Sequence, residues 1–170
     1  MAKTSAGLLM YRSRNGEIEV LLVHPGGPFW TRKNAGAWFV PKGELEGDEE
    51  PLVAARREFQ EETGVEVNGP FTPLGEVKHK SGKKVIAWAV EGNWDTSLLR
   101  SNTFVVEWPP KSGQQLEFPE IDKAEFFSLS EARKTIHEAE SAFLDRVAEH
   151  LHVDTVPNTV TTSEQQGQLF

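Results

Sequence analysis

The chain has 170 residues and a mass of 19.0 kDa, enough for one domain with a hydrophobic core and too little for two of ordinary size. Its 18 Lys and Arg against 26 Asp and Glu leave a net charge of -8, so long-range attraction to nucleic acid or to an anionic membrane is not expected. The absence of cysteine excludes disulfides, thiolate metal sites and cysteine nucleophiles.

The sequence carries no targeting signal that we recognise. No apolar run approaches the ~20 residues of a membrane span, and the first residues lack the features of a signal peptide. Together with the lack of cysteine, this predicts a cytoplasmic protein. We expect one domain over 1–153. The segment 154–170 is rich in Thr, Ser, Gln and Asn, a composition that predicts a disordered tail.

The first forty residues have the pattern of a β-hairpin followed by a loop. Apolar runs at 6–11 and 18–24 flank a polar turn and predict two paired strands. The segment 25–36 is rich in Gly, Pro and polar residues and predicts an exposed loop, the kind of segment that often contacts ligands. A short apolar segment, 37–40, ends at Pro41.

A helix is predicted over 48–63. Asp48 is the expected cap, acidic residues follow in the first turn, and Pro51 suits an early helical position. Gly64 is the expected stop. The apolar residues at helical spacing would form the buried stripe: Leu52, Ala55 and Phe59.

Further strands are predicted at 71–78 and 83–90, which would form a hairpin around 79–82, and at 102–108 and 124–129. A last helical region begins near Ser128 or Ser130, with apolar residues recurring at 132, 136, 143, 147 and 151. This order of strands and helices predicts the α/β class, with a mixed sheet between helices in an α/β/α sandwich.

The predicted helix carries an unusual concentration of acid. Glu58, Glu61 and Glu62 stand at i, i+3 and i+4 and therefore share one helix face. Like charges at this spacing cost roughly 0.2 to 0.5 kcal/mol per pair, a cost that a divalent cation would offset. Mg²⁺ and Mn²⁺ prefer carboxylate, carbonyl and water oxygens and leave positions that phosphate can occupy. The alternative is a solvated acidic helix face.

The residues around this cluster resemble a family signature. The segment 43–65 fits the pattern G-x5-E-x7-R-E-U-x-E-E-x-G-U of the Nudix hydrolases, where U is a bulky apolar residue, and fills all seven fixed positions: Gly43, Glu49, Arg57, Glu58, Glu61, Glu62 and Gly64. A chance match is on the order of 10⁻⁸ per starting position. Phe59 departs mildly from the pattern, because an aliphatic residue is commoner there.

The resemblance implies an α/β/α sandwich, with the signature forming a loop-helix-loop that holds one to three Mg²⁺ or Mn²⁺ ions. By position, the side chains of Glu58, Glu61 and Glu62 resemble the metal ligands, and a backbone carbonyl at Gly43 would add another oxygen. Arg57 and Glu49 resemble the supporting pair, and we count Arg57, Glu58 and Glu61 among the catalytic candidates.

The reaction that such a site suits is the attack of water on a phosphorus atom within a diphosphate linked to another group. A carboxylate must accept the proton. Glu58 or Glu61 could do so, but members of the family also use a base from a downstream loop, and Glu120 is our candidate there. The alternative for Glu120 is an ordinary loop carboxylate.

Several residues outside the signature are candidates for contacts with the substrate, and each has an alternative explanation. Lys42 beside the metal loop is a candidate phosphate ligand, against the alternative of a plain surface lysine. His79 and Lys83, with Lys80 and Lys84, form a compact basic cluster that could bind outer phosphates or simply be a polar hairpin tip. Trp30 and Trp38 could stack on a base, although a Trp inside an apolar segment is more often part of the core.

The preferred substrate class is the dinucleoside polyphosphates, because 5–7, 11–12 and 39–43 look similar to Nudix members acting on diadenosine polyphosphates and diphosphoinositol phosphates. Nucleoside triphosphates and ADP-ribose are the alternatives, followed by a nucleotide sensor without catalysis and a simple cation-binding module. The partner expected is a small nucleotide-type molecule, with no nucleic acid and no membrane. The oligomeric state is left open.

Overall fold

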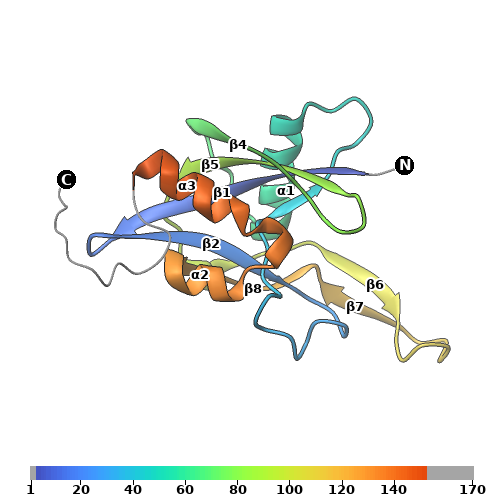
Figure 1. Cartoon of the computed structure of the whole chain (residues 1–170). Helices are drawn as coiled ribbons and strands as arrows, with labels where there is room; N and C mark the ends of the chain where they lie inside the picture. The colour runs from blue at the N-terminus through green and yellow to red at the C-terminus, as the bar shows by residue number, and fades with distance from the viewer. Residues whose placement is uncertain (1–2, 153–170) are drawn as a thin grey trace.

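The computed structural model describes residues 3–152, which form a six-stranded mixed sheet with helices on both faces (Figure 1). The strand order is β4-β5-β1-β2-β8, and β3 pairs with the start of β1. The central strand β1 runs parallel to β5 and antiparallel to β2 and β3. The bounds are β1 Thr4–Arg14, β2 Glu17–Pro25, β3 Lys42–Glu44, β4 Phe71–Lys78, β5 Lys84–Glu91 and β8 Ile121–Ser128.

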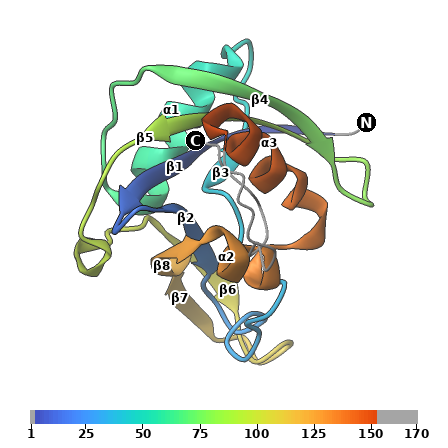
Figure 2. The same cartoon turned by 60° about the vertical axis from the view of Figure 1, so that its left-hand side comes forward.

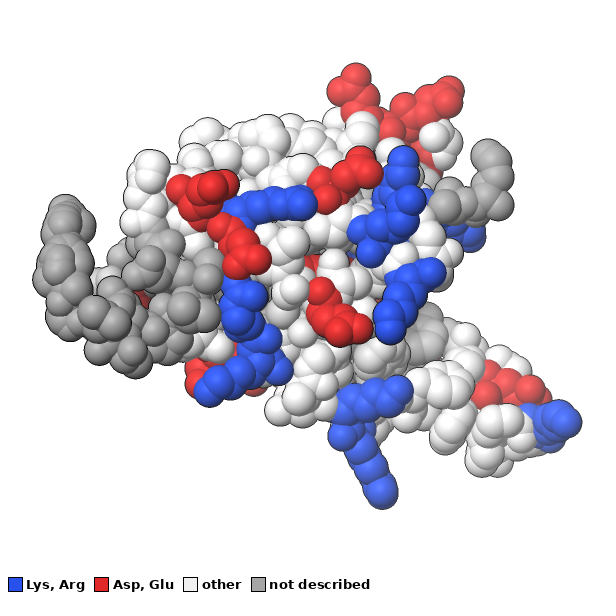
Figure 3. All heavy atoms as spheres, in the orientation of Figure 1, with Lys and Arg blue, Asp and Glu red and all other residues white. Residues whose placement is uncertain are grey.

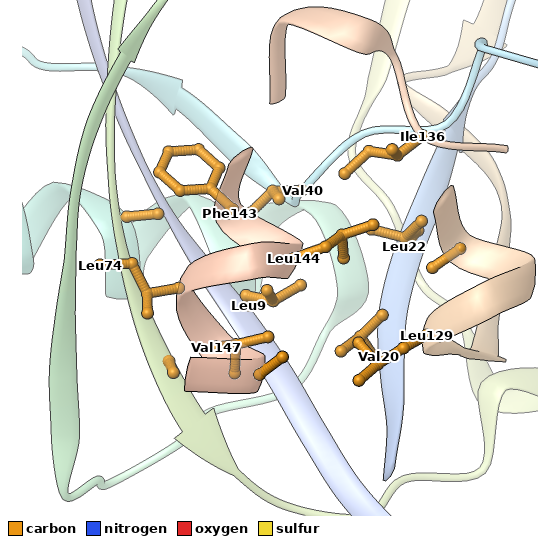
Figure 4. Close-up of a cluster of buried hydrophobic side chains, with 14 of the residues drawn as sticks. Leu9, Val20, Leu22, Val40, Leu74, Leu129, Ile136, Phe143, Leu144 and Val147 are labelled. Carbon is orange, nitrogen blue, oxygen red and sulfur yellow. The ribbon is translucent and has the colours of Figure 1, made fainter. Parts of the chain in front are cut away.

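The two faces of the sheet bury different sets of side chains. Leu8 and Met10 of β1 pack with Phe59 of helix α1 (Pro51–Thr63). Leu9, between them in the sequence, packs on the opposite face with residues of α2 (Leu129–Thr135) and α3 (Ala142–Leu151), as Figure 4 shows. This alternation follows from the period of two along a strand. Figure 2 shows the helices on either side of the sheet, which confirms the predicted α/β/α arrangement.

Several predicted elements are confirmed. The hairpin of β1 and β2 and the hairpin of β4 and β5 both form. The strand bounds agree with the prediction within one residue except for β1, which begins two residues earlier and ends three residues later than predicted. Helix α1 ends at Gly64, whose φ of 85° lies in the left-handed region that glycine adopts without strain. Ala55 and Phe59 are fully buried, and Leu52 is partly buried against the same cluster.

The predicted start of this helix is wrong. The helix begins at Pro51 with Glu50 as its N-cap, and Asp48 remains in the preceding loop. The cause is Glu49, whose carboxylate accepts the N–H of Glu46 and is held by Arg57. These bonds fix the segment before Pro51 as a loop, and the prediction of Asp48 as the cap is thereby corrected.

The last helical region is interrupted, in contrast to the continuous pattern predicted from its apolar spacing. After α2, Ile136 is extended with φ −70° and ψ 145°, a 3-10 turn follows at Glu138–Glu140, and α3 begins at Ala142. The backbone here bonds to the segment at Trp38 instead of continuing the helix: Trp38 N–H donates to the carbonyl of Thr135, and His137 N–H donates to the carbonyl of Trp38.

Two strands escaped prediction. β3 has only three residues, too few for a periodic signal. β7 (Gln115–Pro119) pairs with β6 (Thr103–Glu107) in a separate two-stranded sheet that projects from the body in Figure 1. The predicted strand at 124–129 begins earlier, at Ile121, and a 3-10 turn occurs at Thr96–Leu98.

Two sequence predictions concern the ends and the surface of the chain. The tail predicted over 154–170 lies outside the described residues. No helix within 3–152 has the length and apolarity needed to cross a bilayer. On the face drawn in Figure 3, basic and acidic side chains are interspersed.

Candidate functional site

The short strand β3 brings Gly43 against the acidic face of α1. A Cβ atom added to Gly43 would lie 1.9 Å from Cδ of Glu58 and 2.0 Å from its Oε1, far inside any tolerated contact. The carboxylate of Glu58 therefore rests directly on the glycine backbone. Glycine is required at this position because any side chain would overlap the carboxylate of Glu58. The sequence pattern alone did not give this reason.

Arg57 organises the acids around it. Its Nε and Nη2 donate to the two carboxylate oxygens of Glu49 at 2.8 and 2.9 Å, a bidentate pair of the strong kind. Its Nη1 donates to Glu58 at 2.8 Å and to Glu61 at 3.2 Å. Hydrogen bonds from Arg57 lower the pKa of Glu49 to about 2, so Glu49 stays ionised and holds the guanidinium in place.

Two carboxylates on this face of α1 have raised pKa values. Burial raises the pKa of Glu62 to about 8, and the nearby carboxylates of Glu58 and Glu120 add to the shift. Burial also raises the pKa of Glu58, despite its contact with Arg57. A desolvated carboxylate surrounded by other carboxylates favours the neutral form unless a cation is present.

Backbone hydrogen bonds hold Glu120, the candidate base, close to the carboxylates of α1. The N–H of Asn102 donates to the carbonyl of Glu61 at 2.9 Å, and the N–H of Glu120 donates to the carbonyl of Asn102 at 2.8 Å. This chain of bonds fixes Glu120 beside the last turn of α1. Burial raises the pKa of Glu120, and the charge of Glu61 contributes, consistent with close approach.

The donor set suits a divalent cation. The acids offer hard carboxylate oxygens, and the only hydrogen bond to the carboxylate of Glu62 found among residues 3–152 comes from the N–H of Lys42 at 3.2 Å. Within 3–152, no three acidic or imidazole side chains lie close enough together to coordinate one metal ion. The carboxylates of Glu58 and Glu61 are instead hydrogen-bonded to Arg57. The residues fit the chemistry of Mg²⁺ or Mn²⁺, and loading would shift these carboxylates.

A cavity of about 380 Å³ opens beside these acids. It collects Lys42, His79 and Lys83, the three predicted substrate ligands, with Trp30 and the acids Glu62 and Glu120 in its lining. The remaining lining residues are Val23, Pro25, Phe39, Val40, Ile121 and His137. The lining of this pocket therefore combines basic groups, acids and aromatic rings.

Comparison with known proteins agrees with this geometry. The family model of the NUDIX domain matches residues 1–147. The chain belongs to the Nudix hydrolase family. In structure it is similar to an Ap4A hydrolase from C. elegans in a binary complex, with a TM-score of 0.63, 22% identity, and coverage of 89% of this chain and 98% of that one.

A second Nudix fold of similar likeness is the NUDIX domain of Shewanella oneidensis NrtR complexed with ADP ribose, with a TM-score of 0.62, 14% identity, and 89% of each chain covered. A Myxococcus xanthus protein named octanoyltransferase is 30% identical over 112 residues, which is 66% of this chain. The chain spans only 27% of the length of that relative.

Not every candidate of this Nudix domain lies in the pocket. The pocket lining does not include Gly43, Glu49, Arg57, Glu58 or Glu61. Lys80 and Lys84 are exposed and absent from it as well. Trp38 is buried in the core at 2% exposure and donates its indole N–H to Asn34, so it is not available for stacking on a base.

Sequence reasoning missed Glu140, Phe39 and His137 near the pocket. Glu140 is 0% exposed, and the sequence does contain a signal for it. It stands four residues after Ile136 and three before Phe143, at a place on the apolar stripe where an apolar residue is expected. A charged residue inside such a stripe indicates a buried partner.

Proposed function

We propose that this Nudix protein is a metal-dependent pyrophosphohydrolase whose preferred substrates are dinucleoside polyphosphates. The observation that supports the proposal is that Lys42, His79 and Lys83 line the same pocket as Glu62 and Glu120. A chain of phosphates needs cations along its length and metal-binding acids at the bond to be cleaved.

The basic residues of the pocket lining suit a chain of several phosphates. Lys42 is partly buried and Lys83 is half-buried, and both line the cavity with His79. Burial and the nearby charge of Lys42 lower the pKa of Lys83, consistent with two cationic groups close together. An anionic ligand between them would relieve this repulsion.

The aromatic residues of the pocket lining suit the base of a nucleotide. The ring of Trp30 meets the ring of Phe39 edge-on, with centroids 5.6 Å apart, and both line the cavity. Stacking of a base on an aromatic ring contributes about 1 to 3 kcal/mol. We assign Trp30 as the base-stacking candidate.

Glu58, Glu61 and Glu62 would hold the divalent cations, Mg²⁺ or Mn²⁺, with the carbonyl of Gly43 as a further candidate oxygen. When bound, the cations would neutralise the phosphoryl oxygens and lower the pKa of a coordinated water. Arg57, anchored by Glu49, orients Glu58 and Glu61. Lys42, His79 and Lys83 bind and align the phosphate chain.

Glu120 is assigned as the base. It would accept a proton from the attacking water as the new P–O bond forms. The bond between phosphorus and the bridging oxygen breaks, and the bridging oxygen leaves with the departing phosphate. One water is consumed, and two phosphate-bearing products result.

The test is a cleavage screen with product chromatography. Candidate substrates are diadenosine tetraphosphate, ATP, ADP-ribose, NADH and a diphosphoinositol phosphate, each with Mg²⁺ or Mn²⁺ and with EDTA. We expect the highest kcat/KM on diadenosine tetraphosphate and loss of activity with EDTA. A higher kcat/KM on another member would overturn the substrate assignment. Nucleotide binding with metal but without cleavage would identify a sensor instead.

A further inference from the structure

A buried carboxylate contacts two of the basic residues that line the pocket. Glu140, in the 3-10 turn between α2 and α3, is 0% exposed. It accepts the backbone N–H of Val40 at 3.0 Å, contacts Nε2 of His79 at 2.9 Å, and pairs with Nζ of Lys42 at 3.0 Å. The substrate could reach Lys42 and His79, which line the cavity, but not Glu140, which is absent from its lining.

The two basic side chains held by Glu140 are also restrained on their other sides. Nζ of Lys42 lies 4.4 Å from the centroid of the Phe39 ring. The ring of His79 stacks on His137 at 5.1 Å between centroids, and His137 stacks in turn on Phe39 at 5.1 Å. Glu140 thus closes a ring of contacts around two basic groups that both line the pocket.

A free lysine loses rotamer entropy when it binds a phosphate. A lysine already held in place has lost this freedom beforehand, and so a larger share of its interaction with phosphate appears as affinity. The same contact compensates the charge of a lysine whose side chain is only 11% exposed.

We propose that Glu140 is a positioning residue that fixes Lys42 and His79 as a preorganised phosphate-binding edge. The inference rests on the proposed function, since it assigns phosphates as the ligands of these two residues. Glu140 itself touches no substrate. Its contribution is to the geometry of the two groups in front of it.

A merely structural role would give a different result. Removing a buried hydrogen-bonded carboxylate lowers stability in either case. If Glu140 only stabilised the fold, KM would not change in a variant that remains folded. If it positions Lys42 and His79, KM rises, and the rise depends on the presence of Lys42.

The experiment is a double-mutant cycle measured on diadenosine tetraphosphate with Mg²⁺, well below the melting temperature. We expect Glu140→Met to raise KM at least tenfold, with kcat changed less than threefold. In a Lys42→Met background the same substitution is expected to raise KM by a clearly smaller factor, because only the part of the effect that acts through His79 remains. The matched control is Glu138→Gln, an exposed glutamate of the same turn, which should leave KM unchanged.

Two further variants keep the test decisive. Glu140→Gln keeps one accepting oxygen, whereas both oxygens of Glu140 are engaged, so its KM should lie between those of wild type and Glu140→Met. Glu140→Asp keeps the charge but shortens the reach, so it should raise KM about fivefold even if Glu140→Met does not fold. An unchanged KM in Glu140→Asp, or an equal KM rise for Glu140→Met in both backgrounds, overturns the proposal.

Failure of the proposed function is distinguishable from failure of this inference. If the wild type cleaves none of the candidate substrates, binding of inorganic tripolyphosphate with Mg²⁺ is measured by calorimetry on the same variants. Weaker binding in Glu140→Asp than in wild type, with Glu138→Gln unchanged, supports the positioning role without any catalysis. Equal binding in all three proteins contradicts it.

Discussion

The contact between Gly43 and Glu58 permits a sharp prediction. In Gly43→Ala, the new Cβ would lie 1.9 Å from Cδ of Glu58, whereas ordinary contacts begin at 3.4 Å, so the carboxylate must retreat by about 1.5 Å. The displaced atom is the far end of a flexible side chain, and the backbone at Gly43 needs no left-handed conformation. The fold should therefore survive with a loss of about 1 kcal/mol.

Activity should respond much more strongly than stability. A misplacement of about 1 Å at a catalytic group can cost on the order of 10²-fold in rate, which corresponds to about 2.7 kcal/mol of barrier. We expect kcat for the preferred substrate to fall about a hundredfold at saturating Mg²⁺, together with weaker Mn²⁺ binding in calorimetry.

The matched control is Gly92→Ala. Gly92 also needs no left-handed conformation, and its new Cβ would approach only the flexible end of Met10, at 3.0 Å. This variant should keep full activity. A Gly43→Ala protein within threefold of the wild-type kcat would refute the reasoning that Glu58 must rest on the glycine backbone to act.

Three further predictions follow from single contacts. Arg57→Lys should lower kcat about tenfold or more, because a lysine cannot hold Glu49 in bidentate fashion while bonding Glu58; steady-state kinetics at saturating metal checks this, and wild-type kcat would contradict it. Glu120→Gln should lower kcat at least tenfold with little change in KM or in metal affinity; a change confined to KM would exclude Glu120 as the base. Although burial raises the pKa of Glu140, the charge of Lys42 and hydrogen bonds outweigh it and lower the pKa from its ordinary 4.5 to about 2. The resulting stabilisation, about 3 kcal/mol, is present above pH 4.5 and is lost as the pH falls toward 2. The free energy of unfolding in urea should therefore fall more steeply over this pH range in wild type than in Glu140→Gln. An equal pH dependence in the two proteins would contradict the ion pair between Glu140 and Lys42.

The acidic half of the site could be predicted from the sequence because its geometry is local. Glu58, Glu61 and Glu62 share a face through helical spacing alone. Gly64 ends the helix in the expected left-handed conformation. The wrong prediction of Asp48 as the helix cap also has a local cause. The loop before the helix is held by a bond between Glu49 and Arg57, which are only eight residues apart.

The basic half depends on contacts between distant segments. Glu140 is buried against Val40, a hundred residues earlier in the chain, and against His79, 61 residues earlier. The break after α2 arises from backbone bonds to Trp38, which no helical pattern contains. Apolar spacing could indicate where Glu140 lies on the stripe, but not which donors surround it.

The central claim is that the face formed by Glu58, Glu61 and Glu62 holds a divalent cation that the reaction requires. The most direct measurement is calorimetric titration with Mn²⁺, together with kcat, for wild type, Glu61→Gln, Glu62→Gln and the exposed control Glu66→Gln. We predict binding in wild type and in the control, with Mn²⁺ affinity and kcat each lowered more than tenfold in the other two while their folds persist. Unchanged metal binding and turnover in both Glu61→Gln and Glu62→Gln would contradict the account.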